Sequence, residues 1–279
     1  MRRILALFFL LASFFVPGSR AETLPDFSSL RLITTAQVSD VIDPLRVRLT
    51  DGTIVQLAGL DVPDLDPHEP GKNAQAAQLY LSDRLKNKQI RLYQTKDPEK
   101  GRTNRMGYAL GHLVLKGDGE DKDDLWINGT LLEMGFARLF PGPRNPEMAT
   151  AMIDRENHAR LSKQGLWADS AYRLLTPDTA AERMDDWGIV EGTVFSIATV
   201  KNTVYLNFGP DWRTDFTIVV ESAIRKAFGK QGIDLFTLQG KTLRVHGWLE
   251  RYNGPAIKLS DPAWLEILET NNALSEPTE

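Results

Sequence analysis

The sequence of 279 residues contains no cysteine. This absence excludes disulfide bridges, thiolate zinc sites, a cysteine nucleophile and a lipid attached to an N-terminal cysteine. A chain of this length can bury enough apolar surface to fold without such cross-links. Side-chain packing must therefore hold the fold together.

Long apolar runs are also scarce, and the single one lies at the N-terminus, where residues 4–16 follow Arg2 and Arg3. Pro17, Gly18 and a small-residue site ending at Ala21 come next. This order is typical of a secretory signal, and the apolar run is shorter than the roughly 20 residues that a spanning helix needs. We predict a signal peptide at 1–21, no transmembrane segment in the mature chain, and export to the periplasm or secretion.

An excess of positive charge is missing as well. The whole chain has a formal net charge of −4, and the predicted signal contains three arginines and no acid, so the mature chain carries −7. An acidic protein has no overall field that attracts a polyanion. Any contact with nucleic acid must therefore come from a local patch.

The residues that are present predict a first domain at 30–175. Two apolar runs flank the turn Asp51-Gly52 and predict a hairpin. Ala77, Leu81 and Leu85 recur at four-residue spacing and predict one buried helix stripe. Further strands are expected at 90–93 and 109–115, and further helices within 127–139 and 146–161. The fold class is α+β, mainly β, with a small barrel and three helices.

A polar segment at 176–186 predicts a linker, and a second domain follows at 187–270. One helix is expected in this domain, at 222–230, and it comes after the third of five strand candidates at 189–200, 203–208, 215–220, 242–250 and 256–259. That order is typical of an OB-like β-barrel. Residues 271–279 are expected to form a disordered tail.

Several ordered motifs resemble those of the staphylococcal nuclease (thermonuclease-like) family. They are Val41-Ile42-Asp43, the run from Val55 to Asp64, Asn104 to His112, Ile127-Asn128 with Gly135-Phe136-Ala137, and Gly165-Leu166-Trp167. Together they cover roughly residues 35 to 170. The resemblance implies a staphylococcal-nuclease-like OB barrel, and the second domain resembles the extra module of some exported bacterial members.

The family cleaves phosphodiester bonds with calcium held by aspartates, a glutamate that acts as base, and two arginines. By resemblance, Asp61 matches one metal aspartate and Asp64 the glutamate, whereas Leu45 stands at the second metal aspartate. Asp43 is a further candidate metal ligand. Gln56 and Tyr108 stand where the family has its arginines. Losing one preorganised donor typically costs roughly 100 to 1000-fold in rate.

Together with the predicted signal, these substitutions predict an exported binding scaffold that contacts nucleic acid weakly. Its catalytic site is largely substituted, so the protein is in effect a pseudoenzyme. One alternative is an active calcium-dependent nuclease on DNA or RNA whose cations are supplied by Arg102 and Arg105. Another is a binding protein whose second domain recognises a protein or glycan of the cell envelope. Whether the protein is an enzyme stays open, and Ca²⁺ is expected as cofactor only for an active site.

Three further groups of residues have sequence contexts that predict their roles. The acidic stretch at 118–124 does not fit a calcium-loop motif and is expected to be a solvated loop. The histidines His112 and His246 lie in apolar strands and are expected to be packed rather than catalytic. Of the aromatic residues in the second domain, Trp212 and Tyr205 are the candidates for stacking on the bases of single-stranded nucleic acid.

Overall fold

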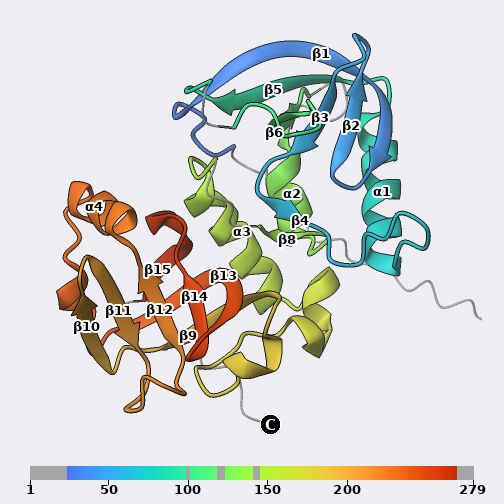
Figure 1. The fold of residues 1–279 in the computed structure, drawn as a ribbon. Helices are drawn as coiled ribbons and strands as arrows, with labels where there is room; N and C mark the ends of the chain where they lie inside the picture. The colour runs from blue at the N-terminus through green and yellow to red at the C-terminus, as the bar shows by residue number, and fades with distance from the viewer. Residues whose placement is uncertain (1–23, 99–100, 118–122, 141–144, 269–279) are drawn as a thin grey trace, which may run out of the picture.

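The computed structural model describes residues 24–98, 101–117, 123–140 and 145–268. The predicted signal, most of the acidic stretch and the C-terminal tail lie outside the described residues. Two β-rich lobes stand next to each other, each with its own sheet, and helices of the first lobe lie between them (Figure 1). None of the helices in the described ranges is both long and apolar enough to cross a membrane.

The first lobe is a closed five-strand barrel that forms as the alternation of apolar residues predicts. Its strands are β1 (Leu30–Asp43), β2 (Arg46–Leu49), β3 (Ile54–Leu57), β5 (Gln89–Thr95) and β6 (Ala109–Leu115). The predicted hairpin is β2–β3, and the parallel pairing of β3 with β6 closes the barrel. The short strand β7 (Leu125–Trp126) extends this sheet beside β6, and β4 (Leu60–Asp61) and β8 (Arg138–Leu139) form a separate two-stranded sheet.

Three helices complete the first lobe, as expected. They are α1 (Lys72–Leu85), α2 (Ile127–Glu133) and α3 (Ala149–Leu161). The stripe Ala77, Leu81 and Leu85 of α1 is fully buried. Helix α2 occupies only the first half of 127–139, because the chain turns at Gly135, whose φ is positive at 65°. After this turn the chain continues into β8.

The second lobe has the predicted OB-like order. Its elements are β9 (Trp187–Thr193), β10 (Ser196–Val200), β11 (Thr203–Asn207), β12 (Thr217–Val220), α4 (Ser222–Lys230), β13 (Thr242–Tyr252), β14 (Gly254–Lys258) and β15 (Leu265–Leu268). The strand expected at 189–200 is two strands. The chain changes partner at its middle, where the amide of Val194 donates to Lys241 O and that of Phe195 donates to Asn207 O. Strand β15 was not predicted.

The segment between the lobes is packed against the second sheet. The amide of Leu175 donates to Ile189 O at 2.9 Å, and that of Asp185 donates to Leu249 O at 2.8 Å. Ala180, in the short 3-10 helix η3 (Ala180–Arg183), is fully buried. Although its composition suggests a free linker, this connection is an ordered part of the fold, and the domain boundaries drawn around it remain predictions.

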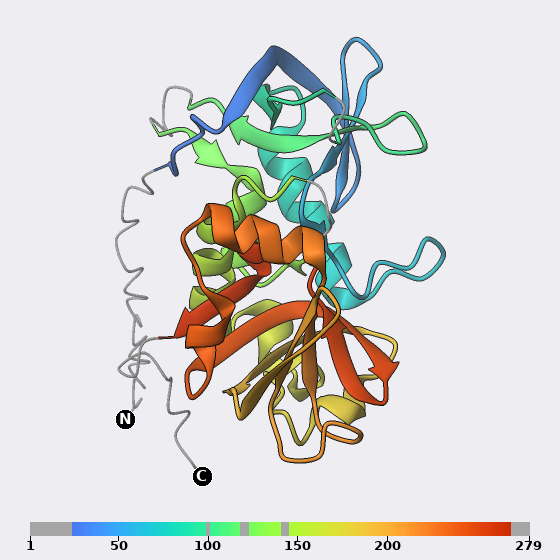
Figure 2. The same ribbon diagram turned by 60° about the vertical axis from the view of Figure 1, so that its left-hand side comes forward.

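The first lobe, blue to green, lies above the second, orange to red, in Figure 2, and helix α3 contacts the second lobe through polar side chains. Asn157 donates to Glu266 on β15 at 3.1 Å, and Glu156 lies 3.3 Å from Nδ1 of His246 on β13. One cluster of buried apolar side chains runs through both lobes. The two barrels therefore share an interior as well as an ionic interface.

Candidate functional site

The turn after β1 holds the position that the resemblance assigns to a metal aspartate. Leu45 stands there, half-buried against the apolar core. The neighbouring Asp43 is 8% exposed; its Oδ1 accepts from the Leu45 amide at 2.9 Å and its Oδ2 from Nε of Arg46 at 2.6 Å. The carboxylate of Asp43 is thus directed back onto its own turn.

Arg46 occupies the region where the family arginines would act. The hairpin register pairs it with Gln56, and its guanidinium lies 5.8 Å from the centre of the Tyr108 ring. Hydrogen bonding to Asp43 raises the pKa of the Arg46 guanidinium. The structure therefore gathers Asp43, Gln56 and Tyr108 around one arginine that the sequence analysis did not select, although the predicted hairpin contained the signal.

Gln56 makes a structural contact from this group. Its Oε1 accepts from Nδ2 of Asn104 at 2.9 Å, and Oδ1 of Asn104 accepts from the amides of Met106 and Tyr108. Asn104 thereby ties the loop before β6 to the barrel. Gln56, which the resemblance aligns with a family arginine, is thus one end of a loop tether.

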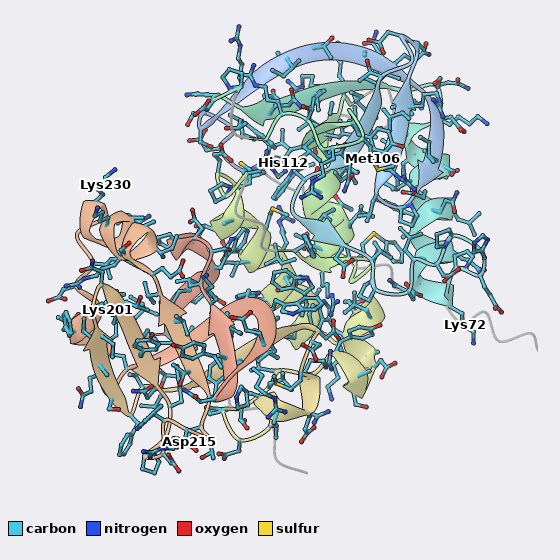
Figure 3. All side chains as sticks on the ribbon, in the orientation of Figure 1. Lys72, Met106, His112, Lys201, Asp215 and Lys230 are labelled. Atoms are coloured by element: carbon cyan, nitrogen blue, oxygen red, sulfur yellow. The ribbon has the colours of Figure 1, made fainter. Side chains whose placement is uncertain are left out.

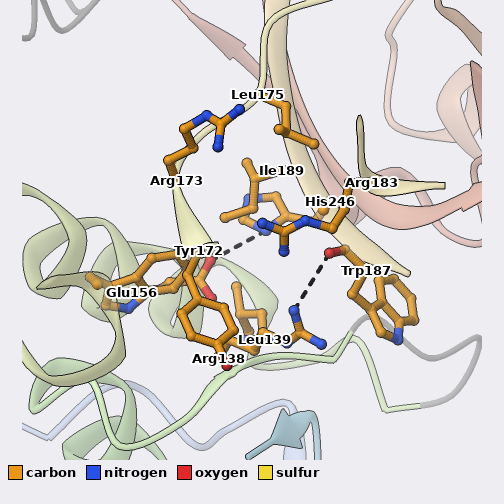
Figure 4. A pocket seen from close by; sticks show the side chains of 12 residues that line it. Arg138, Leu139, Glu156, Tyr172, Arg173, Leu175, Arg183, Trp187, Ile189 and His246 are labelled. Carbon is orange, nitrogen blue, oxygen red and sulfur yellow. Dashed lines mark hydrogen bonds and ion pairs between the residues drawn. The ribbon is translucent and has the colours of Figure 1, made fainter. Parts of the chain in front are cut away.

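Asp61 lies apart from this group and faces the second lobe. Its Oδ2 accepts from Nε of Arg138 on β8 at 2.8 Å. The same guanidinium lies 3.4 Å from Asp186 Oδ1 and 3.5 Å from the carbonyl oxygen of Trp187 (Figure 4). Asp61 is therefore part of the ionic connection between the lobes, through an arginine that is distant in sequence.

Asp64 caps helix α1. Its carboxylate accepts from the amides of Asn73 at 2.9 Å and Ala74 at 3.1 Å, two of the donors that a helix start leaves without intrahelical partners. A Cβ on Gly71 would lie 2.3 Å from Oδ2 of Asp64, so glycine is required for this close approach. The carboxylate expected to act as base thus has a structural partner.

The two other candidate cations, Arg102 and Arg105, have separate surroundings. Arg102 donates to the carbonyl oxygens of Thr95 at 2.9 Å and Lys96 at 2.8 Å, which fixes it along the edge of its loop. Arg105 is exposed in the following turn. Calcium needs six to eight oxygen ligands. Within the described part of the chain, no group of three or more histidine or carboxylate side chains is arranged to hold a metal ion.

A small cavity of about 20 Å³ with a mixed lining lies between the lobes, and Figure 4 shows this lining, including Glu156, Tyr172, Arg183 and His246. This volume suits a single water molecule. Burial raises the pKa of the Glu156 carboxyl, while the charges of His246 and Arg160 and the amide of Leu139 act in the opposite direction. The cavity belongs to the interface and is too small for an organic ligand.

The two aromatic candidates of the second lobe lie on its outer surface. Trp212 is 52% exposed, in the loop between β11 and β12, and Arg213 stacks on it at 4.6 Å. Tyr205 on β11 faces Tyr252, with ring centroids 6.0 Å apart and an interplanar angle of 19°. The two side chains line one pocket, together with Tyr252.

The first lobe is thus an OB-like barrel followed by helices, a class that binds nucleic acids among other ligands. Residues 54–169 match the family model described as staphylococcal nuclease homologue. The matched residues make up less than half of the chain. The chain therefore contains a staphylococcal nuclease-like domain, as its motifs predict. No curated protein matches the chain, and the second barrel lies outside the matched residues.

Proposed function

We propose that this protein is an exported, non-catalytic binding scaffold of the periplasm or the extracellular space. In this proposal the nuclease-like barrel serves as a structural support and contacts nucleic acid weakly, whereas ligand recognition belongs to the second barrel. A fold hosts many functions, and the residues at the site decide among them.

The observation that carries the proposal is the separate engagement of the three carboxylates. Asp43 pairs with Arg46, Asp61 pairs with Arg138, and Asp64 caps α1. Phosphodiester cleavage by this family's chemistry needs a hard cation, a base and cationic donors at one point. Since the carboxylates point to separate partners, they do not fit a calcium ion.

The alternative is a nuclease with rearranged cations, and the position of Arg46 favours it. This guanidinium lies beside Gln56 and Tyr108, the two positions at which the family arginines are replaced. The ion pair between Arg46 and Asp43 argues against this alternative, because it neutralises the arginine and leaves one carboxylate fewer for binding a metal. The two readings differ in whether the purified protein cleaves.

Hydrolysis of single-stranded DNA and RNA by the mature protein discriminates between them. We expect no cleavage above the buffer rate with calcium or with a chelator. Asp61→Asn and Arg46→Ala serve as paired controls, because either substitution should reduce an activity that this barrel performs. Cleavage that calcium supports, and that both a chelator and one of these substitutions abolish, contradicts the proposal.

A further inference from the structure

The outer face of the second barrel carries a pocket of about 340 Å³. Its lining includes Val200, Tyr205, Asn207, Trp212, Thr217 and Tyr252. Tyr205 and Asn207 alternate along β11 with Val204 and Leu206, which are buried in the core, so strand alternation places the pocket residues on the opposite face. The volume lies at the low end of the range for small-molecule sites.

Aromatic rings form the walls of this pocket. Tyr205 and Tyr252 are stacked side chains whose hydroxyls lie 3.2 Å apart, and this hydrogen bond raises the pKa of the Tyr205 hydroxyl. Tyr252 is 48% exposed and Trp212 is 52% exposed. Large apolar rings grouped at one exposed position mark a ligand surface more often than isolated ones do.

The loop that presents Trp212 is held in place. Asp215 Oδ2 accepts from the Asp211 amide at 2.7 Å, and the Asp215 amide donates to Asp211 O at 2.9 Å. A Cβ on Gly254 would lie 2.5 Å from the carbonyl oxygen of Thr214, so the turn between β13 and β14 packs directly on this loop. A preorganised ring loses little conformational entropy when a ligand binds.

The floor of the pocket is polar and uncharged. Asn207 and Thr217 are 6% and 4% exposed, and Thr217 Oγ1 donates to Oδ1 of Asn207 at 3.2 Å. The Asn207 amide nitrogen makes a long contact of 3.4 Å to Ser196 Oγ. Asn253, in the left-handed region with φ 65°, adds a second amide at the rim. The pocket thus offers amide and hydroxyl groups between aromatic walls.

The charges around the pocket do not suit a polyanion. No lysine, arginine or carboxylate is among its lining residues. Arg213, which stacks on Trp212 outside the lining, is paired with Asp211 at 3.8 Å. Lys258 is paired with Glu221 at 2.7 Å, and Glu250 adds a further negative charge. Lys230 on α4 lies at the opposite end of the lobe from Asp215, which borders the Trp212 loop (Figure 3). Binding of single-stranded nucleic acid instead combines stacking with a positive groove.

We propose that this pocket binds a short, uncharged pyranose segment of a glycan. The C–H face of a sugar ring packs on Trp212 and Tyr252, and its hydroxyls exchange hydrogen bonds with Asn207, Thr217 and Asn253. OB-like barrels bind oligosaccharides as well as oligonucleotides, and the neutral lining selects the former. The inference rests on the proposed function only in assigning recognition to the second barrel, and it holds whether or not the first barrel cleaves.

Calorimetric titration of the full mature chain with cellotriose, maltotriose and triacetylchitotriose tests the proposal. We expect saturable binding of at least one trisaccharide, and Trp212→Ala should weaken it by at least about tenfold, corresponding to roughly 1.4 kcal/mol. Trp212→Phe, which keeps a stacking face, should retain most of the affinity. Trp248→Ala is the matched control, because Trp248 is also exposed on this lobe, at 46%, but packs on Trp187.

Two results overturn the proposal. One is a lack of binding by all three trisaccharides; the other is tighter binding of a thymidine decamer that Trp212→Ala abolishes. The thermal transition of each variant is compared with that of the parent, and since Trp212 is an exposed loop residue we expect no change in folding. The sugars contain no phosphodiester, so failure here is separate from failure of the cleavage assay.

Discussion

The two barrels of this chain have the same strand order and differ in what their outer faces carry. In each, a three-stranded meander is followed by a helix and two further barrel strands. In the second barrel β9 and β10 together form the first strand of the meander, and β15 is an additional strand. The third and last barrel strands pair in parallel, β3 with β6 and β12 with β14, and the first pairs with the fourth, β1 with β5 and β9 with β13. Buried apolar alternation therefore determines the fold twice, while exposed residues give the two barrels different chemistry.

The outer face of the first barrel is occupied by its own contacts. Asp43, Arg46, Gln56 and Asn104 bind one another or the adjacent turn. The corresponding region of the second barrel has exposed rings and an uncharged floor. Charged groups that already form ion pairs must give up those contacts to bind a ligand, whereas exposed rings that a loop holds in place can contact a ligand at little entropic cost.

The two barrels also bury one histidine each, in different surroundings. His112 on β6 is 1% exposed and packs against Trp126, and neither ring nitrogen has a hydrogen-bond partner within the described ranges. His246 on β13 is 3% exposed and lies between Glu156 and Glu266. Both are packed, as their apolar strands predict. The histidine of the first barrel is thus buried without a polar partner, an uncompensated histidine, whereas that of the second barrel has a carboxylate at each ring nitrogen.

The largest expected effect comes from breaking the ionic interface at Arg244. This guanidinium is 2% exposed and contacts Glu191 at 2.7 Å and Glu266 at 3.3 Å, and it donates to Asn157 of the first lobe. Arg244→Met leaves two carboxylates without their cation, so we expect the free energy of unfolding to fall by roughly 3–5 kcal/mol. Denaturant unfolding followed by circular dichroism measures it.

Arg173→Met is the control for that change. Arg173 pairs with Glu182 on the surface, where both side chains are about half exposed. An exposed ion pair contributes about 0–1 kcal/mol. Equal losses in the two variants would show that the buried network does not join the barrels energetically.

A second prediction uses the uncompensated histidine. Burial lowers the pKa of His112 to about 3. The unfolded chain, with a histidine pKa near 6.5, then binds a proton that the folded chain does not, so stability is present above pH 6.5 and is lost as the pH falls. The free energy of unfolding then falls by about 1.4 kcal/mol per pH unit, which gives a loss of roughly 2 kcal/mol between pH 6.5 and 5.

The variant His112→Phe should remove this loss, as seen in denaturant midpoints at pH 7, 6 and 5. His158→Gln is the control, since His158 is 63% exposed and should leave the slope unchanged. The carboxyl of Glu266 titrates at lower pH: burial alone would raise its pKa, but His246 and Arg244 hold it below the ordinary value. An unchanged pH slope in His112→Phe would mean that another group carries the acid response.

Local patterns predicted the elements, whereas pairings across the chain remained out of reach. Helix α4 begins and ends where the sequence analysis placed it, because turn residues and a change of periodicity mark both ends. Strand β15 has four residues and follows directly on a short 3-10 helix, so it lacks a bounded alternating run. The break at Val194 depends on which strand pairs with each half, and alternation along one strand does not contain that information.

The candidate site divides in the same way. Arg46 and Asp43 are three residues apart, and the hairpin register places Gln56 opposite Arg46, so this group could be predicted from the sequence. Asp61 and Arg138 are separated by 77 positions, and only the assembled fold brings them together. The resemblance suggested which positions to compare with the family, but it could not indicate which partners the carboxylates at those positions would have.

The smallest expected effect tests whether Asp64 is a structural residue of the first barrel. Its carboxylate accepts from two amides at the start of α1, so Asp64→Ala should lower the free energy of unfolding by about 1 kcal/mol. Asp64→Asn keeps an oxygen acceptor and loses only the charge next to the helix dipole, so it should cost roughly half as much. Both values come from urea unfolding with and without calcium.

A calcium ion bound through Asp64 would stabilise the parent and neither variant, because a ligand that binds the folded state raises its stability. We expect calcium to leave all three proteins unchanged. Calcium-dependent stabilisation of the parent alone would assign Asp64 to a metal site and would bring the first barrel back toward the chemistry of its family.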